Sequence, residues 1–192
     1  MRGGRNEVVE EYQHLIERGL TQESIYRGQL LKLRVDTVAL PNGETAQREI
    51  VEHPGAVAAV PVTEDDQVIM VRQFRYPINQ ITIEIPAGKL EFGEEPETAL
   101  KRELAEETGL KAGKIQLLGE FYSAPGFSNE KILVYLVREL SPQVITEKTD
   151  SEEFLEPVKI PLDEALRMAA DGRLRDAKTI IGLNWAKAAL RE

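Results

Sequence analysis

The sequence predicts an α+β (mixed α/β) fold, in which many short strands are interrupted by helices at intervals. Two patterns lead to this prediction. Apolar residues alternate with polar ones along several runs of five to nine residues, as expected of half-buried strands. Longer segments from residue 96 onward carry the residue types that begin and end helices. The hydrophobic fraction of 42% is sufficient for a real core.

The first part of the chain predicts a helix followed by a β-hairpin. Apolar residues recur at helical spacing over 8–16, and Gly19 is expected to end that helix. Alternating residues over 31–39 and a second run over 45–52 flank Asn42-Gly43, which is the strongest local hairpin signal. We expect residues 1–52 to form an appendage to a core domain of residues 53–192.

The core is predicted to contain further strands and three helices. The strands are expected over 56–62, 68–74, 81–85, 115–121, 132–137 and 154–160. A helix is expected over 96–108, because Pro96 suits the first helical turn and Gly109 suits the left-handed position after the last one. The tail is expected to be helical over 162–170 and 176–190, and Asp176 is a good N-cap for the last helix.

Charge and composition exclude several classes of function. The net charge of −9 opposes binding to a phosphate backbone, so nucleic acid is not an expected partner. A bound divalent metal can still invert the local sign and admit a small anionic substrate. The 192 residues include no cysteine, which rules out disulfides and thiolate chemistry. No apolar run is long enough to span a membrane, and we expect a cytoplasmic protein.

A concentration of carboxylates in the 96–108 helix predicts a metal site. Glu103, Glu106 and Glu107 share one helix face, where like charges destabilise an isolated helix unless a cation is present. Oxygen ligands suit hard ions, so Mg²⁺ is expected and Mn²⁺ is an alternative. Arg102 is placed to orient Glu106 and Glu94. An acidic face that only contacts solvent is the alternative interpretation of any single Glu pair.

The spacing over 88–110 resembles the Nudix hydrolase signature, Gly-x5-Glu-x7-Arg-Glu-U-x-Glu-Glu-x-Gly-U, where U is aliphatic. Every fixed position is present: Gly88, Glu94, Arg102, Glu103, Leu104, Glu106, Glu107, Gly109 and Leu110. The resemblance implies a Nudix fold, with a mixed β-sheet between helices, and hydrolysis of a nucleoside diphosphate linked to another group. It also implies that Glu103, Glu106 and Glu107 bind metal together with the Ala87 carbonyl, and that Glu107 and Arg102 serve catalysis.

Flanking segments are similar to the ADP-ribose pyrophosphatase subgroup of that family. The segments that carry the similarity are 48–53, 73–75, 84–88 and 123–130, the last of which contains the downstream marker Pro125. The resemblance implies hydrolysis of ADP-ribose to AMP and ribose 5-phosphate by a homodimer whose N-terminal strands pack on the partner. The substrate-binding residues that it implies are Tyr26, Arg48, Arg75, Pro125, Gly126 and Glu130.

The general base is expected in the acidic run Asp150-Ser151-Glu152-Glu153-Phe154. Relatives often have a second acidic residue where this chain has Ser151, so two candidates remain. Glu153 is favoured because it is the last acidic residue before the aromatic one, and Glu152 is the alternative. A base on a loop can engage after the substrate has bound.

Several alternatives remain open at this point. The substrate could be another nucleoside diphosphate sugar, such as GDP-mannose, because the diphosphate contacts are shared. The fold could instead serve as a non-catalytic nucleotide sensor, although such a module has little need of all three box carboxylates. Arg48 could pair across its hairpin, Tyr26 could be ordinary strand packing, and Pro125-Gly126 is a common turn.

Overall fold

The computed structural model describes residues 11–143 and 154–191. Contacts between residues divide the chain into two compact units. The N-terminal unit contains the described residues up to His53 together with Ala124–Asn129. The main unit contains Pro54–Ser123 and the described residues from Glu130 onward.

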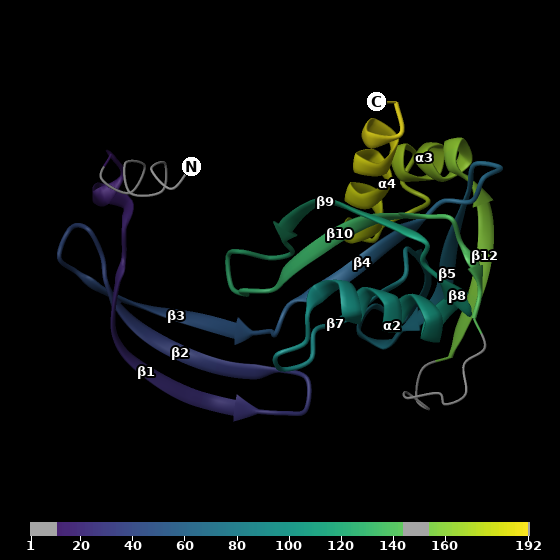
Figure 1. The fold of residues 1–192 in the computed structure, drawn as a ribbon. Coiled ribbons are helices and arrows are strands. Elements are labelled where there is room, and N and C mark those ends of the chain that lie inside the picture. The colour runs from purple at the N-terminus through teal and green to yellow at the C-terminus, as the bar shows by residue number, and fades with distance from the viewer. Residues whose placement is uncertain (1–10, 144–153, 192) are drawn as a thin grey trace. The chain divides into compact units, whose positions relative to one another are not determined.

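The N-terminal unit is built on a three-stranded antiparallel sheet (Figure 1). Its strands, in spatial order, are β1 (Arg18–Arg27), β2 (Lys32–Ala39) and β3 (Thr45–Glu52). The predicted hairpin is confirmed as β2 and β3, which pair in register from Lys32 with Glu52 to Ala39 with Thr45. Gly43 adopts the left-handed conformation that the connecting turn requires (φ 87°).

The helix expected over 8–16 and its end at Gly19 are wrong in the described part of the chain. Only a short 3-10 helix, η1 (Gln13–Leu15), is present there, and Gly19 lies inside strand β1. The apolar residues recur at helical spacing in the sequence, but Tyr12, Leu15 and Ile16 are exposed. Because they do not pack against other elements, no tertiary contact stabilises a helix there. The following residues instead pair with β2 from Arg18 to Arg27, with register shifts between Gly19 and Thr21 and between Ser24 and Tyr26.

The main unit contains two sheets and a short two-stranded pair (Figure 1). The mixed sheet has the order β7 (Ala87–Lys89), β4 (Ala56–Pro61), β10 (Lys131–Arg138) and β9 (Lys114–Tyr122), with β4 and β10 parallel. The antiparallel sheet has the order β12 (Leu155–Pro161), β5 (Gln67–Arg75) and β6 (Gln80–Glu84). The short elements are η2 (Tyr76–Ile78), β8 (Leu110–Lys111) and β11 (Ser141–Pro142).

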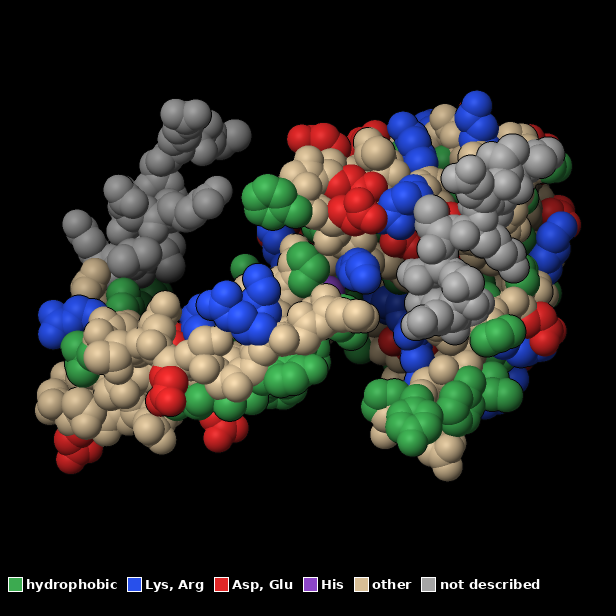
Figure 2. All heavy atoms as spheres, turned by 90° about the horizontal axis from the view of Figure 1, so that it is seen from below, with side chains coloured by type: hydrophobic (Ala, Val, Ile, Leu, Met, Phe, Trp, Pro, Cys, Tyr) green, Lys and Arg blue, Asp and Glu red, His purple; other side chains and the backbone are tan. Residues whose placement is uncertain are grey.

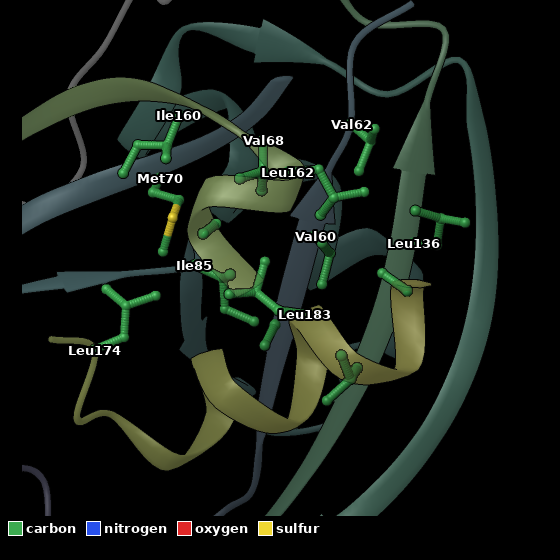
Figure 3. Close-up of a cluster of buried hydrophobic side chains, with 14 of the residues drawn as sticks. Val60, Val62, Val68, Met70, Ile85, Leu136, Ile160, Leu162, Leu174 and Leu183 are labelled. Carbon is green, nitrogen blue, oxygen red and sulfur yellow. The ribbon is translucent and has the colours of Figure 1, made fainter. Parts of the chain in front are cut away.

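Helices cover both faces of the mixed sheet, as the fold class predicted. On one face, Val57 and Ala59 of β4 pack with Leu100 of α2 (Pro96–Thr108). On the other, Val60 packs with Leu183 of α4 (Ala177–Ala189), and α3 (Leu162–Ala170) completes that layer (Figure 3). Because both faces are covered, all six residues of β4 are buried, which is typical of a central strand.

The helix boundaries agree with the local signals in the sequence. Helix α2 begins at Pro96 and ends before Gly109, whose φ of 68° is the left-handed cap. Helix α4 follows Asp176, whose carboxylate accepts a hydrogen bond from the Thr179 N–H at 3.0 Å. Burial of Leu100 and Leu104 fixes the rotation of α2, and so decides where its carboxylates point.

Charged side chains of both signs lie next to one another on the surface of the main unit (Figure 2). Examples are the ion pairs Arg72–Glu156 at 2.5 Å between β5 and β12, and Lys187–Asp163 at 2.7 Å between α4 and α3. In the described part of the chain, no helix has the length and apolar character needed to cross a membrane.

Candidate functional site

Two of the predicted metal-binding carboxylates converge on the backbone at Ala87 and Gly88. Glu107 is 8% exposed, and its Oε2 accepts a hydrogen bond from the Ala87 N–H at 3.0 Å. The Glu103 carboxylate lies directly on Gly88, where an added Cβ would come 1.8 Å from its Cδ. Gly88 is therefore required for this close approach, which explains a glycine at the first position of the motif.

Arg102 connects the remaining acidic residues of the motif. Its Nε and Nη2 donate to the two oxygens of Glu94 at 3.2 and 3.1 Å, and its Nη1 lies 2.6 Å from Glu103 Oε1. Glu106 Oε2 lies 3.5 Å from the same Nη1. The hydrogen bonds from Arg102 lower the pKa of Glu94, and those to Glu94 and then Glu103 raise the pKa of Arg102. The motif arginine thus contacts Glu94 and Glu106, the two carboxylates expected from its position, and also Glu103.

The donor chemistry of this site fits a hard divalent cation. Glu103, Glu106 and Glu107 supply carboxylate oxygens, and Ala87 supplies a backbone carbonyl, which are the ligands that Mg²⁺ and Mn²⁺ prefer. Gly88 leaves room for Glu103 to approach the backbone beside Ala87. Within residues 11–143 and 154–191, no three acidic or histidine side chains already form a metal-binding group. Glu103 and Glu106 instead contact Arg102.

Arg75 forms an ion pair with a carboxylate that sequence reasoning missed. Its Nε and Nη2 donate to Glu84 Oε1 and Oε2 at 2.8 and 2.7 Å. Glu84 is 3% exposed and also accepts hydrogen bonds from Lys178 and from Thr82. Burial raises the pKa of Glu84, but the hydrogen bonds from Arg75 and the charge of Lys178 outweigh it and lower that pKa to about 2. Lys178 lies on α4, 94 positions after Glu84, so no local sequence pattern could have revealed the contact between Lys178 and Glu84.

Arg48 and Tyr26 lie on the sheet of the N-terminal unit. Arg48 forms a bidentate ion pair with Glu17, which precedes β1, and its Nη1 donates to the Gln47 carbonyl at 2.9 Å. Its ion-pair partner therefore lies outside the β2–β3 hairpin. Tyr26 is 60% exposed, and its ring lies so close to Gly28 that a Cβ there would be 2.7 Å from Cε1. An exposed aromatic ring held over a glycine is available for stacking.

Pro125 and Gly126 form an exposed turn that belongs to the N-terminal unit. The residues after the turn are fixed to β3, because the Val51 N–H donates to the Phe127 carbonyl at 2.8 Å and the His53 N–H donates to Asn129 Oδ1 at 2.8 Å. Glu130 belongs to the main unit and accepts a hydrogen bond from the Ser123 hydroxyl at 2.5 Å. The predicted base residues Glu152 and Glu153 lie outside the described residues.

Comparisons with known proteins identify the family of the chain. The NUDIX domain family matches residues 52–181. The chain is 44% identical to the ADP-ribose pyrophosphatase of Bacillus subtilis (strain 168) over 171 residues, which cover 89% of this chain and 92% of that protein. It is 42% identical to the methanol dehydrogenase activator of Bacillus methanolicus, over 88% of this chain and 91% of that protein.

Two further comparisons concern substrate and fold. A GDP-mannose pyrophosphatase of Yersinia pestis (strain Pestoides F) is 34% identical over 69% of this chain and 70% of its own length. A crystal structure of an ADP compounds hydrolase superposes with a TM-score of 0.80 at 24% identity, over 91% of this chain and 94% of that one. The fold is therefore shared with that hydrolase. With its complete acidic motif and its match over residues 52–181, the chain belongs to the NUDIX family.

Proposed function

We propose that the chain hydrolyses the pyrophosphate bond of ADP-ribose to AMP and ribose 5-phosphate. The observation that carries the proposal is the convergence of Glu103 and Glu107 on the backbone at Ala87 and Gly88. That geometry belongs to a complete NUDIX motif, and the chain resembles a bacterial ADP-ribose pyrophosphatase over nearly its full length. The reaction class requires positioning and charge neutralisation at a diphosphate, which these residues are arranged to provide.

In this proposal the motif residues hold Mg²⁺, with Mn²⁺ as an alternative. Glu103, Glu106, Glu107 and the Ala87 carbonyl are the proposed ligands. When bound, the cation neutralises charge on the diphosphate and makes water a better nucleophile at neutral pH. Arg102 pairs with Glu94, Glu103 and Glu106 and so keeps these carboxylates close together. Without Arg102 these carboxylates would repel one another.

The proposed substrate contacts are those that the resemblance to ADP-ribose pyrophosphatases implies. Arg75 and Arg48 are the proposed contacts to the diphosphate or the terminal ribose, because arginine forms charge-assisted hydrogen bonds to phosphate oxygens. Tyr26 is the proposed stacking partner of adenine. Pro125, Gly126 and Glu130 are proposed to border the bound substrate. Glu153, with Glu152 as the alternative, is proposed to remove the proton from the attacking water.

We also propose that the chain acts as a cytoplasmic homodimer. Strand β1 and the turn after it expose large apolar side chains (Figure 2). They are Leu20, Ile25, Tyr26, Leu30 and Leu31. Contiguous exposed apolar residues favour a protein partner, and a second copy is the simplest one. A chain with no cysteine lacks the disulfide bonds that are common in oxidising compartments.

The 34% identity to a GDP-mannose pyrophosphatase makes GDP-mannose the second candidate substrate. A phosphatase-coupled assay decides between them, since the coupling enzyme releases phosphate from the products but not from the intact diphosphate ester. The panel is ADP-ribose, GDP-mannose, UDP-glucose, NADH and diadenosine polyphosphates, each with Mg²⁺ and with EDTA. The highest kcat/KM on ADP-ribose, lost in EDTA, supports the proposal. Preference for GDP-mannose changes the substrate and keeps the chemistry. Binding without turnover indicates a nucleotide sensor.

A further inference from the structure

A partly buried cluster of charged and polar residues joins the N-terminus of helix α4 to strands β5 and β6. The cluster consists of Arg75, Thr82, Glu84, Asp176 and Lys178, which we call the Glu84 cluster. Two of its members are almost completely buried: the exposed fractions of the Glu84 and Lys178 side chains are 3% and 12%. A buried carboxylate is costly to leave uncompensated, so an arrangement of this kind needs a full set of partners.

Glu84 has such a set. Arg75 makes two parallel hydrogen bonds to it at 2.8 and 2.7 Å, and the Thr82 hydroxyl donates to Oε1 at 2.6 Å. Lys178 donates to Oε2 and also pairs with Asp176 Oδ2 at 3.1 Å. The two parallel bonds fix the plane of the Arg75 guanidinium, which a single contact cannot do. The Arg75 side chain is nevertheless 40% exposed, so part of it is accessible from solvent.

The backbone after Glu84 leads directly to the metal-binding residues. The Ile85 N–H donates to Thr179 Oγ1 at 2.9 Å, and that hydroxyl donates to Asp176 Oδ2 at 2.6 Å. The Ala87 N–H donates to Glu107 at 3.0 Å. Within four consecutive residues, the chain is therefore attached first to the start of α4 and then to α2. The backbone segment 84–87 therefore connects the Glu84 cluster to the NUDIX motif.

We infer that Glu84 and Lys178 are positioning residues that hold Arg75 for an anionic substrate, an inference that rests on the proposed role of Arg75 at the diphosphate. Glu84 fixes the guanidinium, and Lys178 supplies a compensating positive charge. With both present, two cations face the two carboxylates of Glu84 and Asp176. Without Lys178, the cluster carries a net negative charge beside the place where a diphosphate binds, which opposes its binding.

A double-mutant cycle tests whether Glu84 acts through Arg75. Glu84→Gln and Arg75→Ala are each expected to raise KM for ADP-ribose about tenfold and to change kcat less than about threefold. The double variant is expected to have the KM of Arg75→Ala alone, because there is then no guanidinium to position. Glu156→Gln is the matched control, since Glu156 pairs with Arg72 of the same strand β5, and it is expected to leave KM unchanged.

Lys178 provides an independent test that does not depend on the folding of the Glu84 variant. Lys178→Met is expected to raise KM several-fold. Lys178→Arg is expected to keep KM close to the wild-type value, because it keeps the positive charge. Lys187→Met on the same helix, which breaks the Asp163 pair, is the control and should leave KM unchanged. A thermal melt of each variant distinguishes an increase in KM from a loss of folded protein.

The outcomes distinguish this inference from the proposed function. Additive effects of Glu84→Gln and Arg75→Ala on KM, or an unchanged KM in Lys178→Met, would overturn the positioning role. The proposed function would still stand if the wild-type protein turns over ADP-ribose. An unchanged KM in Arg75→Ala would remove both the substrate role of Arg75 and the inference built on it. Absence of ADP-ribose turnover in the wild type would contradict the proposed function, and the same cycle run on the preferred diphosphate substrate would still decide the role of Glu84.

Discussion

Replacement of Gly88 by alanine should inactivate the protein while leaving it folded. The backbone at Gly88 does not require positive φ, so alanine is tolerated there by conformation. The new Cβ, however, would lie 1.8, 2.0 and 2.3 Å from Cδ, Oε1 and Oε2 of Glu103. Ordinary contact begins near 3.4 Å, so the carboxylate must move by about 1.6 Å, the difference between 3.4 and 1.8 Å.

The size of the effect follows from that displacement. A misplacement of about 1 Å in a catalytic array can reduce the rate about 10²-fold, so Gly88→Ala should lower kcat by at least that factor. The group that moves is the end of a flexible side chain, so the free energy of unfolding should change by less than about 1 kcal/mol. Movement of Glu103 also removes its contact with Arg102 Nη1 at 2.6 Å.

The measurement is coupled turnover of ADP-ribose over a range of Mg²⁺ concentrations, together with a urea unfolding curve. Gly19→Ala is the matched control, because nothing lies within 4 Å of a Cβ at that position in strand β1. The control should keep wild-type kcat. A kcat for Gly88→Ala within threefold of wild type would refute the argument that the Glu103 carboxylate must remain on the glycine.

Three further predictions concern single carboxylates. Glu107→Gln should reduce metal-dependent turnover at least about 10²-fold; near-normal activity at the same Mg²⁺ concentration would contradict its role as a ligand. Glu153→Gln should lower kcat about 10²-fold with little change in the Mg²⁺ dependence, the range of general-base catalysis, and the same loss in Glu152→Gln alone would exchange their roles. The folded pKa of Glu84, about 2, lies below its ordinary value of 4.5, so its stabilisation is complete above pH 4.5 and is lost as the pH falls toward 2. Urea unfolding at pH 7 and pH 3 should therefore show a larger loss in wild type than in Glu84→Gln, by at most about 2 kcal/mol, because at pH 3 the pH has fallen about 1.5 units below 4.5.

Elements with strong local signals were predictable from the sequence. Helix α2 begins and ends where Pro96 and Gly109 indicated, because both residues restrict the backbone at the helix ends. The hairpin of β2 and β3 followed in the same way from Asn42-Gly43. The pairing of Arg102 with Glu94 and Glu106 was predictable as well, since it depends on spacing along one helix and the loop before it.

Features that depend on distant pairing were not predictable. Strand β1 is exposed along its whole length, so it carries no alternation of apolar and polar residues, and its partner β2 determines its structure. Lys178 reaches Glu84 only because α4 packs on the mixed sheet. Arg48 could have paired across its hairpin, but Glu17, 31 residues earlier, provides the carboxylate instead. In each case the observed contact depends on the position of a segment that is distant in the sequence.

The reaction itself is the most direct test of the proposed function. The purified chain is incubated with ADP-ribose and Mg²⁺, and the products are separated by anion-exchange chromatography. AMP and ribose 5-phosphate are expected in equal amounts, with both absent when EDTA is added or when Glu107→Gln replaces the wild type. Intact ADP-ribose after incubation with the wild-type protein, or cleavage that persists unchanged in EDTA, would contradict it.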